Sequence, residues 1–85
     1  MIDVQPGTEW TDTHPRIPIS LLQRGYQRAS LRRRLRIVEV DGLWINYRSS
    51  WEIPHASGWL ELASTLVHGT RAKFESGRYQ PLENP

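Results

Sequence analysis

The stretch Arg36-Ile37-Val38-Glu39-Val40-Asp41-Gly42-Leu43-Trp44-Ile45-Asn46-Tyr47 carries the strongest structural signal in this 85-residue sequence. Asp-Gly between two alternating apolar segments predicts a β-hairpin, because a type I′ turn needs positive φ at both central residues. An Asp41-Gly42 turn pairs Val40 with Leu43, and it turns one apolar set toward a core: Val38, Val40, Leu43, Ile45 and Tyr47. The opposite face is mixed and carries Ile37, Glu39, Trp44, Asn46 and Arg48.

Helix signals lie on both sides of this hairpin. Ser20 to Gln23 has the form of a capping box and Gly25 can end a helix, which predicts a short helix over 19–24. Ser30 precedes leucines at i,i+4 spacing, which predicts a second helix over 29–35. A third helix is predicted over 58–68 from helical spacing of Trp59, Leu62, Ala63, Leu66 and Val67. A strand over the same stretch is the open alternative, with Leu60, Leu62, Ser64 and Leu66 on one side.

These elements predict a small α+β fold in one domain. The order helix, turn, helix, hairpin is similar to that of winged-helix DNA-binding domains, in which the second helix enters the major groove. The similarity is one of element order, and no sequence motif accompanies it. We expect residues 1–18, which contain several prolines, to form an extended arm pinned by Trp10, residues 19–79 to form the compact domain, and residues 80–85 to fray.

Composition places the chain among small globular proteins. Apolar residues make up 38% of the sequence, which is enough for a small core, and there is no cysteine. Absence of cysteine fits a reducing compartment. The apolar runs are too short for a membrane-spanning helix, and residues 1–15 lack the pattern of a signal peptide. We therefore expect a cytoplasmic protein without a membrane partner.

Charge is organised by segment along the chain. Residues 1–15 contain acids and no Lys or Arg, whereas residues 16–36 contain no acid. The basic residues of that second segment are all arginines: Arg16, Arg24, Arg28, Arg32, Arg33, Arg34 and Arg36. The guanidinium group matches the geometry of phosphate and also stacks on bases, so this segment indicates a contact with a polyanion.

The function expected from this segment is that of a small basic nucleic-acid-binding protein, regulatory or accessory. The candidate nucleic-acid contacts are Arg24, Arg28, Arg32, Arg33, Arg34, Arg36 and Arg48. One alternative is a non-enzymatic protein-interaction module, an inhibitor or adaptor, that binds an acidic surface of a larger protein. Another is that the arginines are solvated or pair with the acidic arm, Glu61 or Glu75. A homodimer is compatible with each of these functions.

Aromatic residues add candidate contacts. Tyr26, Trp44 and Trp51 could stack on bases or anchor an interface, and the alternative is that they fill the core. The three histidines are far apart in sequence, and no metal-ligand spacing, phosphate-binding loop or nucleophile motif accompanies them. We therefore expect no catalytic residue, no metal and no cofactor, and we expect that the protein is not an enzyme.

Overall fold

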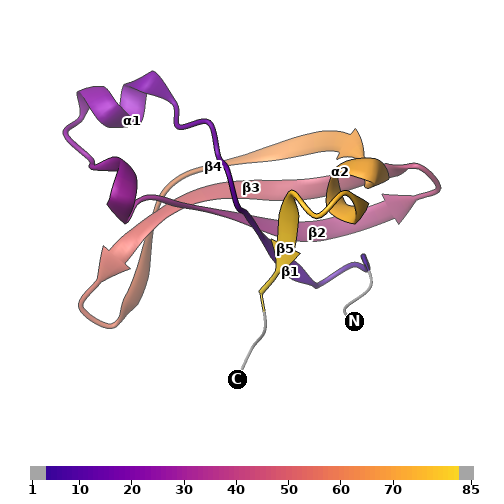
Figure 1. Ribbon diagram of the computed structural model, residues 1–85. Helices are drawn as coiled ribbons and strands as arrows, with labels where there is room; N and C mark the ends of the chain where they lie inside the picture. The colour runs from indigo at the N-terminus through magenta and orange to yellow at the C-terminus, as the bar shows by residue number, and fades with distance from the viewer. Residues whose placement is uncertain (1–3, 83–85) are drawn as a thin grey trace.

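The computed structural model describes residues 4–82, which form one five-stranded antiparallel sheet with strand order β4-β3-β2-β1-β5 (Figure 1). The strands are β1 (Glu9–Asp12), β2 (Arg32–Asp41), β3 (Trp44–His55), β4 (Gly58–Thr70) and β5 (Tyr79–Pro81). The helical elements are α1 (Ile19–Gln23), a 3₁₀ turn at Arg28–Ser30 and α2 (Arg71–Glu75). The three long strands follow one another as a meander, and β1 and β5 complete the sheet beside β2.

The predicted winged-helix-like α+β arrangement is wrong, because two of the three predicted helices are strands. The stretch predicted as a helix over 29–35 is a 3₁₀ turn at Arg28–Ser30 followed by β2, in which Leu35 and Ile37 are buried and Arg36 between them is exposed. Residues 58–70 form β4, which pairs with β3 along its whole length, so the strand alternative for this stretch is confirmed. Helical spacing of a few apolar residues was outweighed by this pairing with a neighbouring strand.

The remaining helix prediction, over 19–24, is met by α1 at Ile19–Gln23. The capping box predicted for it does not form, since the helix is preceded by Pro18 and has no side-chain cap. Gly25 adopts φ +93° just after the helix, a conformation that glycine tolerates and other residues rarely adopt.

The predicted hairpin forms, but its turn lies one residue later than predicted. Asp41 pairs with Trp44, so the two turn residues are Gly42, at φ 58°, and Leu43. A bulge at Val38 adds a second shift in the register of β2 against β3. A shift of one residue turns a side chain to the other face, so the predicted core face was wrong in part. Ile37 is buried, whereas Val38 and Leu43 are exposed.

The core lies on one face of the sheet, under α2. Phe74 of α2 contacts three aromatic rings edge-on, with centroid distances of 5.5 Å to Trp10, 5.3 Å to Tyr47 and 4.8 Å to Tyr79. The same cluster is completed by four aliphatic residues: Val4, Leu35, Ile37 and Ile45. A second, smaller cluster lies beneath the segment that contains α1, and it is formed by Leu21, Leu31 and Trp51.

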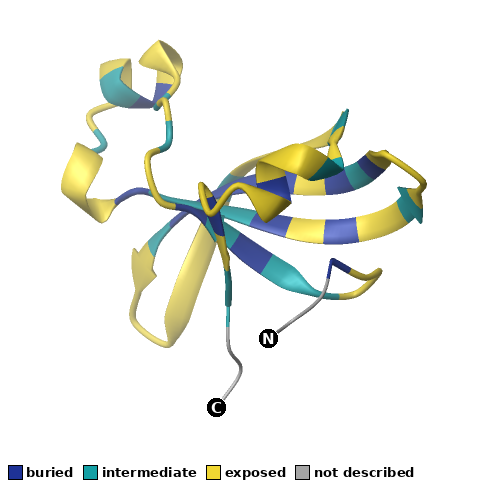
Figure 2. Cartoon of the chain, turned by 45° about the vertical axis from the view of Figure 1, so that its right-hand side comes forward, coloured by how far each residue is buried: buried dark blue, intermediate teal, exposed yellow. Residues whose placement is uncertain are grey.

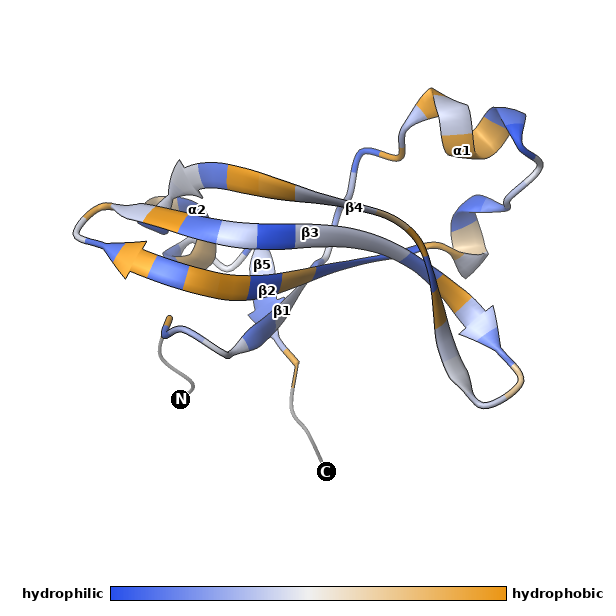
Figure 3. Cartoon of the chain, turned by 180° about the vertical axis from the view of Figure 1, so that it is seen from behind, coloured by the Kyte–Doolittle hydropathy of each residue, from blue (hydrophilic) through white to orange (hydrophobic). Residues whose placement is uncertain are grey.

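Among residues 4–82, no helix covers the opposite face of the meander (Figure 3). Viewed from behind, α2 and β5 lie beyond the strands, and the near face of β2, β3 and β4 is uncovered (Figure 3). This face, called the open face below, is therefore where the protein can present side chains to a partner. Within residues 4–82, no helix is long and apolar enough to cross a bilayer.

Candidate binding surface on the open face

The arginines of β2 are divided between the two faces of the sheet. Side chains alternate along a strand, so Arg32, Arg34 and Arg36 project from the open face while Arg33 projects from the core face. The paired positions on the neighbouring strands follow the same rule. Glu9 of β1 is the register partner of Arg36, and Glu52 of β3 is the register partner of Arg32.

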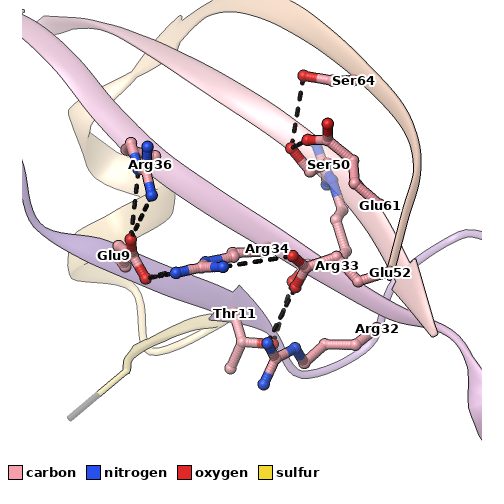
Figure 4. A network of polar contacts seen from close by, with 10 residues as sticks. All are labelled: Glu9, Thr11, Arg32, Arg33, Arg34, Arg36, Ser50, Glu52, Glu61 and Ser64. Carbon is pink, nitrogen blue, oxygen red and sulfur yellow. Dashed lines mark hydrogen bonds and ion pairs between the residues drawn. The ribbon is translucent and has the colours of Figure 1, made fainter. Parts of the chain in front are cut away.

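Acids from both neighbouring strands connect these arginines into one continuous network, the ion-pair chain, made of Arg36, Glu9, Arg34, Glu52 and Arg32 (Figure 4). Arg36 Nη2 donates to Glu9 Oε1 at 2.8 Å, and Arg34 Nε donates to Glu9 Oε2 at 2.9 Å. On its other side Arg34 Nη1 donates to Glu52 Oε2 at 3.3 Å. Arg32 Nη2 donates to Glu52 Oε1 at 2.9 Å and ends the chain.

The electrostatics of the ion-pair chain favour the ionised state of Glu9 and Arg34. Burial opposes ionisation of Glu9, but hydrogen bonds from Arg34 and Arg36 outweigh it, and the pKa of Glu9 lies below its ordinary value of 4.5. The hydrogen bond to Glu9 raises the pKa of Arg34 above its ordinary value. Glu52 is almost fully buried, so its two arginines are needed to compensate its charge. Arg32 and Arg34 are therefore largely engaged inside the fold.

Arg33 has a structural role on the core face. Its Nη1 donates to Asp12 Oδ2 at 3.0 Å and its Nε donates to Ser49 Oγ at 2.8 Å. The side chain of Asp12 has no exposed surface, and Arg78 Nε lies 3.5 Å from its Oδ1. Acids of the N-terminal segment thus pair with several of the predicted contact arginines, as one of the sequence-based alternatives expects.

A shallow cavity of about 80 Å³ opens at the centre of the open face, lined by Arg34, Arg36, Arg48, Ser50 and Glu61. Arg36 and Arg48 stand directly opposite each other in the register of β2 and β3, and both are exposed. Arg48 Nη1 donates to Ser64 Oγ at 3.1 Å, and no carboxylate of residues 4–82 lies within 4.0 Å of its guanidinium nitrogens. Like charges on directly opposed residues destabilise a sheet, so an anion between these two arginines would be favourable.

Aromatic groups lie on either side of this cavity. Trp44 at the start of β3 is 49% exposed and stacks on His68 of β4, with ring centroids 4.8 Å apart. Toward the other end of the meander, the guanidinium of Arg32 lies over the ring of Trp59 at 3.7 Å. The open face thus combines arginine and tryptophan, two of the residue types enriched at the energetic centres of protein interfaces.

The remaining predicted contacts lie away from the open face. Arg24 follows α1, Arg28 begins the 3₁₀ turn, and both side chains are exposed. The guanidinium of Arg24 lies 5.3 Å from the ring centroid of Tyr26. Tyr26 is half-buried against the second apolar cluster. Trp51 is 8% exposed within that cluster, so its indole is not presented to solvent.

Sequence reasoning named the acidic arm, which contains Glu9, and Glu61 as alternative partners of the arginines, but it did not single out Glu52, Ser50 and Ser64. Their roles follow from strand register, which brings together residues from four strands. One signal for the ion-pair chain is present in the sequence. Arg32, Arg34 and Arg36 recur at every second position around a buried Leu35, which is strand spacing rather than helix spacing.

Comparison of the chain with protein-family models, with curated proteins and with solved structures finds no match. A functional interpretation therefore depends on the geometry of the open face and of the exposed arginines.

Proposed function

We propose that this protein is a non-enzymatic protein-interaction module whose open face docks an acidic surface of a larger protein. The observation that carries this proposal is the pair of exposed arginines Arg36 and Arg48, directly opposed across β2 and β3 beside a shallow cavity. A carboxylate placed there could accept hydrogen bonds from both guanidinium groups, and charge-assisted hydrogen bonds of this kind are among the strongest in proteins.

The charge pattern favours a protein over a nucleic acid at this face. At its centre, four arginines (Arg32, Arg34, Arg36, Arg48) alternate with three glutamates (Glu9, Glu52, Glu61). A phosphate backbone is bound through several uncompensated cations, whereas Arg48 is the one of these four arginines without an acidic partner among residues 4–82. Protein interfaces, in contrast, use arginine and aromatic anchors within a rim of mixed polarity.

Trp44 and Trp59 extend the contact beyond the cavity. Both indoles are nearly half exposed, although one stacks on His68 and the other carries the guanidinium of Arg32. A partner that covers these rings would gain apolar burial in addition to the ionic contact. The open face thus offers two apolar anchors with a cationic centre between them.

Fluorescence anisotropy with a short labelled peptide rich in aspartate tests this proposal. Arg48→Glu reverses the charge of an arginine that has no acidic partner in the described residues, and we expect it to weaken peptide binding roughly 10- to 100-fold, as expected for loss of a charge-assisted hydrogen bond. Arg28→Glu is the matched control, since it makes the same charge change at an exposed position outside the open face. Equal loss of binding in both variants would contradict a specific role of the open face.

Nucleic-acid binding is the second candidate, and a different observation favours it. Arg16, Arg24 and Arg28 are all exposed, and no acid occurs between Asp12 and Glu39 in the sequence. Three phosphate contacts would give a log–log salt dependence of affinity with a slope of about −3. Binding to duplex or single-stranded probes that is lost in an Arg24→Glu, Arg28→Glu double variant and kept in Arg48→Glu would support this function. Absence of binding below about 100 μM at low salt would exclude it, because even non-specific binders reach this range.

A further inference from the structure

The strand β4 is an unprotected edge of the sheet. It spans Gly58–Thr70, has β3 as its neighbour on one side, and contains no buried residue (Figure 2). An edge strand presents a row of backbone N–H and C=O groups that can pair with another strand. The other edge of the sheet differs, because β5 is three residues long and contains Pro81. Short strands and proline are devices that block pairing at an edge.

Such devices are missing from most of β4. The segment Leu62–Thr70 contains no Asp, Glu, Lys, Arg or Pro. The register shift of β4 against β3 lies at the start of this segment, between Glu61 and Ala63, so the residues beyond it follow a regular ladder. Long, uncharged and β-branched edges of this kind are the ones that pair with a further strand.

We propose that the β4 edge pairs with β4 of a second copy of this chain, in antiparallel orientation about a two-fold axis at Leu66. Leu66 is the midpoint of the uncharged segment, and its side chain is 59% exposed. In this register Leu66 faces Leu66 of the second copy, Thr65 faces Val67, and Ser64 faces His68. Each of these pairs joins residues of the same sheet face, as an antiparallel ladder requires.

Charge complementarity supports a second copy as the occupant. Glu61 precedes the uncharged segment, and Arg71, which also pairs with Glu75 of its own chain at 2.8 Å, follows it. Antiparallel pairing about Leu66 brings Glu61 of each chain to the end of the ladder where Arg71 of the other chain lies. The uncharged segment is therefore flanked by opposite charges at both ends, and a two-fold axis places Glu61 near Arg71 of the other chain at each end.

The pairing has a consequence for the whole molecule. A two-fold axis perpendicular to the sheet joins two five-stranded sheets into one continuous sheet. Both open faces then lie on the same side of that sheet, and a partner would meet two copies of the Arg36 and Arg48 cavity. The dimer does not depend on what the open face binds, so its test is independent of the proposed function.

Sedimentation equilibrium of the whole chain tests the proposal. We expect the unmodified protein to be a dimer at micromolar concentrations and Leu66→Lys to be a monomer, because two ammonium groups would then face each other at the axis. Leu43→Lys is the matched control, since Leu43 is 78% exposed in the turn between β2 and β3 and lies outside the interface. We expect this control variant to remain a dimer.

Cysteine cross-linking tests the register without relying on a disruptive variant. The chain contains no cysteine, so Leu66→Cys creates a single thiol that lies opposite its own copy. Oxidation should then give a covalent dimer, because directly opposed strand residues are within the Cα separation of a disulfide. Thr70→Cys is the control on the same strand. Its two thiols would be eight residues apart along the ladder, about 27 Å, and should not cross-link.

Two results would overturn the proposal. One is an unmodified chain that is monomeric at about 100 μM, a concentration far above a micromolar Kd; the edge would then be left for a strand of a different protein. The other is cross-linking of Thr70→Cys as readily as Leu66→Cys, which would exclude a two-fold axis at Leu66. If Leu66→Lys fails to fold, as judged by circular dichroism, the unmodified chain and the cysteine variants still decide the outcome.

Discussion

Replacing Arg33 by Gln removes the main charge partner of a carboxylate that has no exposed surface. Asp12 would keep the backbone N–H of His14, at 3.1 Å from Oδ1, and the more distant Arg78 Nε at 3.5 Å. Leaving a buried charge without its partner costs about 3–5 kcal/mol, and these two remaining contacts place the expected cost near the lower value, about 3 kcal/mol. A domain of this length has a total stability of roughly 4–13 kcal/mol, so the variant would lose a large part of it.

Urea unfolding at pH 7, followed by tryptophan fluorescence, measures this loss as a change in the free energy of unfolding. In a thermal scan the same loss corresponds to a decrease in Tm of roughly 15 °C. Arg36→Gln is the matched control: it makes the same chemical change at a side chain that is 59% exposed, and Glu9 keeps Arg34. An exposed ion pair of this kind contributes about 0–1 kcal/mol. If Arg33→Gln costs no more than Arg36→Gln, Asp12 does not depend on Arg33 and the reasoning fails.

Four further predictions concern the core and the pH dependence of stability. Phe74→Ala removes the ring at the centre of the aromatic cluster and should cost about 3–5 kcal/mol in urea unfolding, and a loss below about 1 kcal/mol would contradict its central role. Gly69→Ala should destabilise by about 1 kcal/mol, because the added Cβ would lie 3.1 Å from Cε1 of the buried Tyr47; a more stable variant would show that the ring can move. The shifted pKa values of Glu9 and Tyr47 predict that the free energy of unfolding declines at both ends of the pH scale. The lowered pKa of Glu9 contributes stability that is present above pH 4.5 and lost as pH falls through its folded value, and Glu9→Gln should flatten this acid limb. Burial raises the pKa of Tyr47 to about 12, so its contribution is complete below pH 10 and lost as pH rises toward 12; a Tyr47→Phe variant with the same alkaline limb would refute this.

The local elements that sequence predicted well are those whose signal is contained within a few neighbouring residues. The hairpin around Gly42 follows from two alternating segments joined by a turn-forming glycine, and the end of α1 follows from Gly25, although the capping box predicted at its start does not form. The turn lies one residue later than predicted. A turn at Gly42-Leu43 has positive φ only at its first residue, and Gly42 adopts this conformation without strain. The prediction of a helix over 58–68 was wrong because β4 is an exposed edge strand. None of its residues is buried, so its sequence lacks the alternation of apolar and polar residues that marks a strand with one buried face.

The candidate site was likewise predictable from the sequence only in part, and the rest of it depends on strand pairing. Segmental charge, visible in the sequence, identifies an acidic N-terminal stretch and an arginine segment that could meet each other or an external anion. The charge pattern does not show which arginines form ion pairs within the fold. Glu52 is separated from Arg32 and Arg34 by about twenty residues and reaches them only through the register of β3 against β2. Arg48 stands out as a candidate binding residue only after that register has placed the acids on other arginines.

By itself, then, the sequence determined that the chain has a hairpin at Gly42, a short helix near Ile19 and an arginine-rich stretch before the hairpin. Tertiary structure decided that this stretch is a strand with arginines on both faces, and that Arg33 is bound to Asp12 in the core. It also decided that Arg36 and Arg48 stand together on the open face. The physical reason is that a single strand does not fix its own neighbours. Backbone pairing between distant segments sets the register, and the register decides which charges compensate one another and which remain for a partner.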